Sequence, residues 1–276
     1  MQYKNKFIAF IDILGFKNMV TKSEEGSGMS LDELLQLLKE LEGSQGCFGS
    51  VCPCSKKIES NLDYCVTQIS DCVIMSVEKS PAGLINLIQR CFQVVFRLLK
   101  SGLLCRGYLT EGKIYHTRHQ VIGTGYQKAL SGEKSTIVFK FEDESCGTPF
   151  VEIDPEVCRY IQLETDDCVR KQFETMCVKS SEQGDGYAIF PFKQLSRFLS
   201  INPKDTEGSK RTALNVRKAV LALKDTVRGN GVSNDPKVQN KIRHYTEELD
   251  KQIRFCDSFP ETIDDQLAPF PYHPKQ

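Results

Sequence analysis

The hydrophobic and polar positions follow two different periods along the chain, and each period predicts one kind of element. Runs with strand character are short and bounded by turn residues, whereas leucine-rich segments repeat at helical spacing and end at glycines. In chain order the pattern predicts a strand at residues 6–13, a helix at 31–43, strands at 64–69 and 72–77, a helix at 81–100 and a strand at 103–115. This order predicts an α+β fold of the split βαβ or ferredoxin-like kind, an extended antiparallel sheet with helices on one face.

The capping signals and the second half of the chain complete this outline. Ser30 and Glu33 form a capping box before the first helix, and Ser80 precedes the second long one. Further along, the sequence predicts a short helix at residues 123–130, strands at 135–141 and 149–154, two amphipathic helices at 214–227 and from 235 onward, and an extended tail at 268–276. We therefore expect an α+β domain at residues 1–195 and a helical extension at 196–276.

The composition is that of an ordinary globular protein and argues against several classes of partner. The 276 residues contain 36 Lys plus Arg and 36 Asp plus Glu, so no overall field attracts nucleic acid or a membrane surface. The chain has no apolar run of 18 residues and no signal-peptide pattern at its start, which predicts a cytoplasmic protein. Its 12 cysteines are then expected to be free thiols. Whether Cys47, Cys52 and Cys54 bind a metal stays open, because their spacing is not that of paired CxxC knuckles.

One aspartate stands inside an apolar run and asks for an explanation. The segment FIAFIDILGF at residues 7–16 reads as a buried strand, yet it contains Asp12. An unpaired carboxylate in such a place costs several kcal/mol or takes up a proton. The alternative interpretation is that Asp12 is a hairpin or edge residue without a functional role.

A second aspartate changes this balance. The predicted topology pairs the first strand with the strand after the hairpin, which brings Asp12 next to Asp71 at the hairpin tip. Two adjacent carboxylates repel each other, and a divalent cation removes that repulsion. Oxygen ligands from Asp12, Asp71 and the backbone carbonyl of Ile13 suit Mg²⁺ or Mn²⁺.

The turn that follows Asp12 suggests what the metal would accompany. Leu14, Gly15 and Phe16 lead directly into a predicted helix, and the N–H groups at a helix start bind phosphate without a particular side chain. Carboxylates beside a phosphate-binding turn favour a nucleoside triphosphate as the ligand.

The chain resembles the catalytic domain of the class III nucleotidyl cyclases, which opens with an F-x-D-I-x-G-F motif. The matching residues are Phe10, Asp12, Ile13, Gly15 and Phe16. The family's hairpin aspartate motif is similar to SDCVIMSV, where Ser70 replaces the usual glycine. Its arginine strand and its asparagine helix are approximated by Arg106, Gly107 and Gly112, and by Gly123, Gln127 and Ala129. The resemblance covers roughly residues 7–154 and implies the ferredoxin-like palm of these enzymes.

Several departures from the family pattern suggest which branch the chain is similar to. Gln127 stands in place of the transition-state asparagine and Ser131 in place of an arginine, while the base-selecting positions carry Thr67 and Gln120. This looks more like the pyrimidine cyclases of bacterial Pycsar antiphage defence than like an adenylate or guanylate cyclase. The implied reaction converts UTP, with CTP as the alternative, to the 3′,5′-cyclic monophosphate and pyrophosphate.

The resemblance also implies partners, cofactors and residue roles. It implies a head-to-tail homodimer with two Mn²⁺ or Mg²⁺ ions per site, and a cyclic product that acts on a separate effector protein. Arg106 would contact phosphate, although a structural carboxylate is an equal candidate for its partner, and Gln127 would contact ribose or base. Two other readings stay open: a purine cyclase with an altered pocket, and a degenerate module that binds a nucleotide and dimerises.

Overall fold

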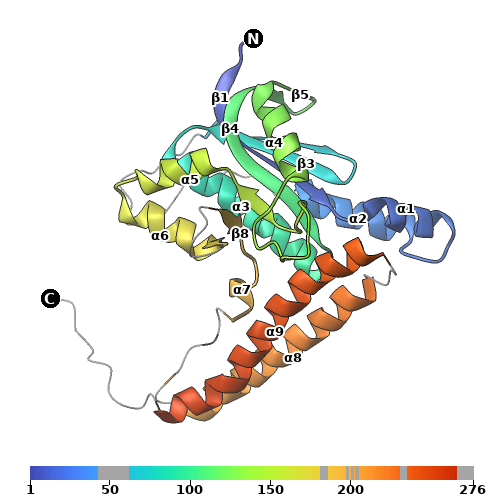
Figure 1. Ribbon diagram of the computed structural model, residues 1–276, viewed down its shortest axis with the longest axis vertical. Coiled ribbons are helices and arrows are strands. Elements are labelled where there is room, and N and C mark those ends of the chain that lie inside the picture. Colours follow the sequence, from blue (N-terminus) through green and yellow to red (C-terminus); the bar gives the residue numbers. More distant parts are fainter. Residues whose placement is uncertain are drawn as a thin grey trace. The chain divides into compact units, whose positions relative to one another are not determined.

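The computed structural model describes residues 1–42, 62–180, 186–196, 199, 202, 205–230 and 235–265 (Figure 1). These residues form two compact units, Met1–Phe190 and Pro191–Gln276, where the sequence predicted a boundary after residue 195. Cys47, Cys52, Cys54 and the proline-rich tail lie outside the described residues. The first unit carries every candidate site residue and is described first.

The first unit alternates strands and helices as the periodicity predicts. Its elements are β1 (Lys4–Ile13), α1 (Phe16–Glu24), α2 (Leu31–Glu42), β2 (Cys65–Ile69), β3 (Cys72–Glu78), α3 (Pro81–Lys100), β4 (Cys105–Thr117), β5 (Gln120–Ile122), α4 (Thr124–Lys134), β6 (Val151–Ile153), α5 (Pro155–Gln162), α6 (Asp167–Met176), β7 (Cys177–Lys179) and β8 (Tyr187–Ile189). Both predicted caps are confirmed. The Ser30 N–H donates to the Glu33 carboxylate at 2.7 Å, and Ser80 Oγ accepts from the Gly83 N–H at 3.0 Å.

The strands form one mixed sheet in the order β2-β3-β1-β4-β6-β8-β7, with β5 paired to β4. The central strand β1 is antiparallel to β3 on one side and to β4 on the other, whereas β4 and β6 are parallel. The α+β class is therefore confirmed. The register places Asp12 directly opposite Cys72 of β3 and Arg106 of β4.

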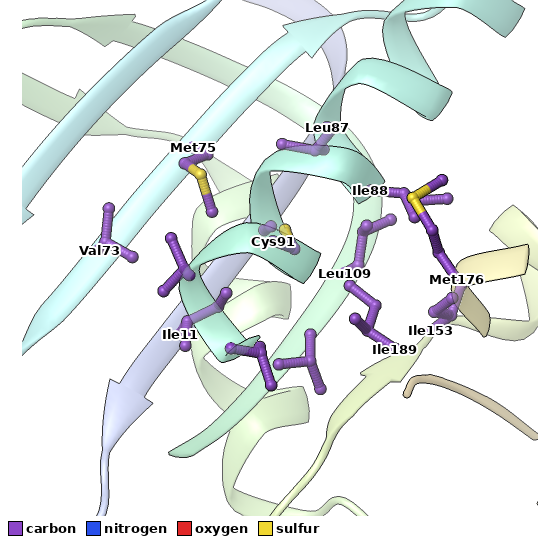
Figure 2. Close-up of a cluster of buried hydrophobic side chains, with 14 of the residues drawn as sticks. Ile11, Val73, Met75, Leu87, Ile88, Cys91, Leu109, Ile153, Met176 and Ile189 are labelled. Carbon is purple, nitrogen blue, oxygen red and sulfur yellow. The ribbon is translucent and has the colours of Figure 1, made fainter. Parts of the chain in front are cut away.

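Helices cover both faces of this sheet, so the prediction of helices on one face is wrong. Side chains alternate along β1: Phe7, Ala9 and Ile11 pack with α3, while Ile8 and Phe10 pack with Ala129 of α4. Figure 2 shows the α3 side, where Ile11, Val73, Met75, Leu87, Ile88, Cys91 and Leu109 meet in one core. The reason is the run of six buried residues from Lys6 to Ile11, since a strand that is apolar on both sides needs a helix on each.

Helix α4 approaches the sheet through glycines. A Cβ added to Gly125 would lie 2.4 Å from Ile8 Cδ1 and 3.0 Å from the Cα of Gly112 on β4. A Cβ on Gly132 would lie 2.3 Å from the ring of Tyr108. Because these glycines have no Cβ, the helix backbone lies close to β4. This close approach determines how far the other α4 side chains lie from the sheet.

The segment at residues 135–141 is not a strand, contrary to the prediction. Its N–H groups at Ile137 and Val138 donate to the Glu152 carboxylate, at 2.6 and 3.1 Å, instead of to a neighbouring strand. Phe139 has a left-handed φ of 57°, and its ring packs against Phe150 and Phe190. Phe139 therefore packs beside the ends of β6 and β8 from an irregular loop.

The second unit contains α7 (Lys193–Ser196), α8 (Thr206–Asn230) and α9 (Pro236–Asp265). The predicted α9 stripe is buried at Ile242, Tyr245, Leu249 and Ile253. Arg217 and Asp257 form an ion pair between α8 and α9 at 2.6 Å, and Phe192 packs edge-on against Tyr245 at 5.1 Å. These contacts make the helical extension a compact body of its own.

Among the described residues, one helix is long and apolar enough to cross a membrane. This helix is α3, and 72% of its most apolar window is buried inside the protein. Burial of this extent is typical of the core helix of a soluble protein, because the apolar residues already face the sheet.

Candidate functional site

Asp12 and Asp71 lie together at one end of the sheet. Asp12 is the penultimate residue of β1, and Asp71 stands in the turn between β2 and β3. The N–H of Ile13 donates to the carbonyl oxygen of Asp71 at 3.1 Å, which fixes the turn against the end of β1. The Asp71 side chain lies close enough to raise the pKa of Asp12, so the structure brings together the carboxylates that the sequence predicted to meet.

The environment of Asp12 disfavours its charge. Burial is the largest cause, followed by the neighbouring charges of Asp71 and Glu133, and together they raise the pKa of Asp12 to about 7. The nearby Arg106 acts in the opposite direction but does not compensate. A carboxyl group in this state gains from a cation, because a bound cation would stabilise the ionised form that the site now penalises.

The hairpin turn that carries Asp71 contains one residue in an unusual backbone conformation. Ser70, the residue before it, has a φ of 53°, in the left-handed region that glycine adopts without cost. The Gln68 amide donates to the Ser70 carbonyl at 3.1 Å and helps to hold the turn. The glycine that the cyclase motif has at this position would adopt the same conformation freely.

Arg106 is paired with a carboxylate inside its own chain. Its guanidinium forms a hydrogen-bonded ion pair with Glu133 of α4, and the two side chains are 18% and 4% exposed. A Cβ at Gly147 would lie 2.7 Å from the guanidinium Nη1, so a glycine makes room for it. Of the two partners that the sequence left open, the structural carboxylate is the one present here. A catalytic role for Arg106 stays a prediction.

The turn after Asp12 has the expected form, with one restriction. Gly15 has a left-handed φ of 80° and forms the N-cap of α1. The Leu14 N–H donates to the Leu104 carbonyl at 3.0 Å and is therefore already used within the sheet. Phe16 begins the helix, where N–H groups have no carbonyl one turn earlier to bind. Gly15 and Phe16 stand at the N-terminal end of α1, which is the position that a phosphate-binding turn requires. Phosphate binding at this turn stays a prediction.

Gln127 and Lys128 are neighbours on α4 but have different surroundings. Gln127 is exposed near the start of the helix, so its amide is accessible to a ligand. Lys128 donates to Glu156 at 2.6 Å and to the buried Asp154 at 2.9 Å. This ion-pair network ties α4 to the start of α5 and occupies the Lys128 ammonium group.

Thr67 belongs to a buried polar network that crosses the sheet. Its Oγ1 donates to the Thr117 carbonyl at 3.0 Å and lies 3.0 Å from Nε2 of His116, whose Nδ1 lies 2.7 Å from Ser76 Oγ. Because the single Thr67 proton goes to the carbonyl, the imidazole Nε2–H donates to Thr67 and Nδ1 accepts from Ser76. Burial, with the charge of Lys6, lowers the pKa of His116 to about 4. The other predicted base contact, Gln120, is exposed.

The residues present fit a metal that completes its coordination with ligand oxygens. In the part of the chain that the structure describes, no three His, Cys, Asp or Glu side chains are grouped as a metal site. Asp12 and Asp71 are two carboxylates, and Mg²⁺ is commonly bound by one or two carboxylates plus substrate phosphates and water. Cys72, opposite Asp12, has its pKa raised to about 11 by burial and these carboxylates, so it stays a thiol.

Sequence reasoning missed two residues that shape this site. Glu133 lies at the far end of α4 from Gln127, and only the packing of α4 on the sheet brings it to Arg106. His116 lies beyond the end of the strand that the sequence predicted, yet it links β4 to Thr67 of β2 and Ser76 of β3. These partners are 49 and 40 positions away, so the residues next to His116 in the chain carried no signal of this role.

Comparison with known proteins adds no identification. No protein-family model matches the chain, and no curated protein matches it.

Proposed function

We propose that this protein is a nucleotidyl cyclase that converts a pyrimidine nucleoside triphosphate, UTP or alternatively CTP, to its 3′,5′-cyclic monophosphate and pyrophosphate. The observation that carries the proposal is the meeting of Asp12 and Asp71 at one end of the sheet, where the Ile13 N–H donates to the Asp71 carbonyl at 3.1 Å and the Asp71 charge helps to raise the pKa of Asp12 to about 7. The pair sits beside a glycine turn that opens a helix, which suits a metal-bound triphosphate.

The strand order supports the same proposal. The order β2-β3-β1-β4, with helices between β1 and β2 and between β3 and β4, is the order expected of a ferredoxin-like palm and supports the proposal that the sheet contains one. In this arrangement the end of β1 and the β2–β3 turn lie side by side, which is where the cyclase motif has its two aspartates. The proposed palm is therefore extended by β6, β8 and β7, and α4 covers its second face.

Asp12, Asp71 and the Ile13 carbonyl would hold Mn²⁺ or Mg²⁺. The bound metal would supply charge neutralisation and a lower pKa for the ribose 3′-hydroxyl. The chain itself supplies position: the Ile13–Asp71 hydrogen bond fixes the carboxylates, and the N–H groups at Gly15 and Phe16 orient phosphate. The Arg106–Glu133 pair stands beside Asp12 and keeps a cation near the site.

The substrate and biological setting follow from the departures in the motif. Thr67, Gln120 and Gln127 replace the residues of purine cyclases, which is why we propose a pyrimidine substrate and a role in antiphage defence. The protein would act in the cytoplasm as a homodimer, and its product would act on a separate effector. A purine cyclase would use the same carboxylates and differ only in product.

The deciding experiment is incubation of the purified protein with ATP, GTP, CTP or UTP, each with Mn²⁺ and with Mg²⁺, followed by mass spectrometry. We expect cyclic UMP or cyclic CMP with pyrophosphate from the unaltered protein. Asp12→Asn and Asp71→Asn are expected to lower turnover at least about a thousandfold, because each removes a metal ligand. Asp32→Asn, at an exposed position of α2, is the control and should retain turnover. Full activity in either site variant would contradict the assignment.

A second candidate, a nucleotide-binding dimerisation module, is favoured by one observation. Arg106 forms an ion pair with Glu133, and Gln127 replaces the transition-state asparagine of the cyclases. Fewer side chains are therefore available to stabilise the transition state. Binding of a triphosphate with Mn²⁺, without any cyclic product, would select this candidate.

A further inference from the structure

A shallow cavity lies along the edge strand β2. Its volume is about 310 Å³, and it begins at Ser70, the residue before Asp71. Its lining is mixed, with two apolar side chains and several groups that donate or accept hydrogen bonds: Leu38, Val66, Thr67, Gln68, Ser70, Arg118 and His119. A shallow cavity with this lining can hydrogen-bond the polar edge of a small ring while Leu38 and Val66 contact its face.

The turn that carries Arg118 is held firmly against β2. Thr67 Oγ1 lies 3.0 Å from the Thr117 carbonyl and 3.3 Å from that of Arg118, and His116 on the same strand bonds to both Thr67 and Ser76. The Thr117 hydroxyl in turn accepts the Gln120 N–H at 3.1 Å. The backbone of Arg118 is therefore fixed, and its exposed side chain lines the cavity from this turn.

The hydrogen-bonding groups left over in the cavity are complementary to a nucleobase edge. The Thr67 hydroxyl is committed to His116 and to backbone carbonyls, so it has no proton left for a ligand. Within the described residues, no ion pair or hydrogen bond occupies the Arg118 guanidinium. The amide of Gln68 donates to Ser70, which leaves its carbonyl oxygen as an acceptor. The cavity therefore offers the N–H donors of the Arg118 guanidinium and the carbonyl oxygen of the Gln68 amide as an acceptor.

We infer that this cavity binds the base of the nucleotide and that Arg118, not Thr67, selects it by donating to a ring carbonyl. Uracil, cytosine and guanine carry such an oxygen, whereas adenine does not, so Arg118 selects against ATP. In uracil and guanine the Gln68 oxygen accepts the ring N–H beside that carbonyl, whereas cytosine has no N–H there, so the cavity favours UTP over CTP. This inference rests on the proposed cyclase function and adds the residue that reads the base.

The test is steady-state kinetics of the full-length protein with UTP, CTP, GTP and ATP, together with calorimetric binding of the same nucleotides in Mn²⁺. Arg118→Ala is expected to raise the KM for the preferred nucleotide about tenfold or more, to change kcat less than about threefold, and to reduce the preference over ATP. Arg118→Lys should recover little, because lysine lacks the planar fork. Arg159→Ala, at an exposed position of α5, is the matched control.

Competition with uridine and cytidine separates base contacts from phosphate contacts. If Arg118 reads the base, inhibition by the nucleoside should weaken in Arg118→Ala to the same extent as triphosphate binding. Unchanged nucleoside inhibition, unchanged KM values, or a wild-type preference for ATP would each overturn the inference while cyclisation itself still stands. A wild-type protein that neither binds nor converts any triphosphate would overturn the proposed function together with it.

Discussion

At the scale of single residues, the site depends on two side chains with strongly shifted pKa values. Asp12 is pushed toward its protonated form by burial and by Asp71, and its pKa lies at about 7. His116 is pushed toward its neutral form, mainly by burial, and its pKa lies at about 4. The Asp12 shift predicts a pH dependence of metal affinity. The His116 shift predicts a pH dependence of folding stability.

The first residue-scale prediction concerns metal affinity. A metal binds the ionised Asp12 carboxylate, so below a pKa of about 7 binding must release a proton. We expect Mn²⁺ affinity, measured by calorimetry without nucleotide, to fall about tenfold per pH unit as the pH decreases from 6 to 5. Asp12→Asn should bind weakly and independently of pH, whereas Asp32→Asn should follow the unaltered protein. An affinity that does not change below pH 7 would contradict the ligand role of Asp12.

The second residue-scale prediction concerns stability in mild acid. His116 is neutral in the folded state down to pH about 4, while the unfolded histidine takes up a proton near its ordinary pKa of 6.5. The free energy of unfolding therefore falls as the pH decreases from 6.5 to 4, by about 2–3 kcal/mol from this residue. The charges that face it are Lys6, which lowers its pKa, and Asp63, which raises it.

Urea denaturation at a series of pH values measures this contribution. His116→Gln should be less stable at pH 7 because it disturbs the Thr67 and Ser76 hydrogen bonds, and its loss of stability in acid should be smaller. His119→Gln, at the exposed neighbouring turn, should behave as the unaltered protein does. Parallel pH profiles for all three proteins would mean that His116 is not buried as a neutral imidazole.

At the scale of elements, the position of α4 determines which carboxylate pairs with the Arg106 guanidinium beside the site. The helix lies on the second face of the sheet because Gly112 and Gly125 allow its backbone to approach β4, and it delivers Glu133 to Arg106. Periodicity predicted the helix but not its face, since Glu133 and Arg106 are 27 positions apart in the sequence. Only packing of α4 decides whether such a pair forms.

The element-scale prediction follows from this close approach. Gly125→Val would place side-chain atoms within 3 Å of Ile8 and the Gly112 backbone, so α4 must shift away from the sheet. We expect a loss of about 2 kcal/mol or more in the free energy of unfolding by urea, and lower turnover at temperatures where the variant stays folded. Thr124→Val, at the exposed preceding position, is the control. Equal stability of the two variants would show that α4 tolerates the displacement.

At the scale of the whole molecule, the proposed homodimer raises the question of which protomer supplies each group. Arg106 lies opposite Asp12 in the strand register and pairs with Glu133 of the same chain. Mixing Asp71→Asn and Arg106→Ala protomers should therefore restore no activity, because both changes damage the same half of the site. Cyclase assays on co-purified mixed dimers measure this directly. Recovery of activity above that of either variant alone would place Arg106 across the interface.

The sequence by itself determined the local parts of this protein. It predicted β1, the β2–β3 hairpin, β4 and the helices α2 and α3, the capping box at Ser30, and the meeting of Asp12 with Asp71, because these depend on periodicity, on turn chemistry and on one simple topology rule. It predicted none of the elements from α5 to α7. It did not predict that residues 135–141 form a loop, since the Glu152 carboxylate that satisfies the loop's N–H groups lies in a later strand.

Only the tertiary structure decided which distant side chains became partners. Arg106 meets Glu133 instead of remaining available for phosphate, and Thr67 is held by His116, 49 positions away, instead of facing a base. A residue's neighbours in the chain fix its secondary structure, but its hydrogen-bond partners depend on how sheet faces, turns and helices pack. For that reason the sequence pointed to the carboxylate pair, while the structure pointed to Arg118 as the group that reads the base.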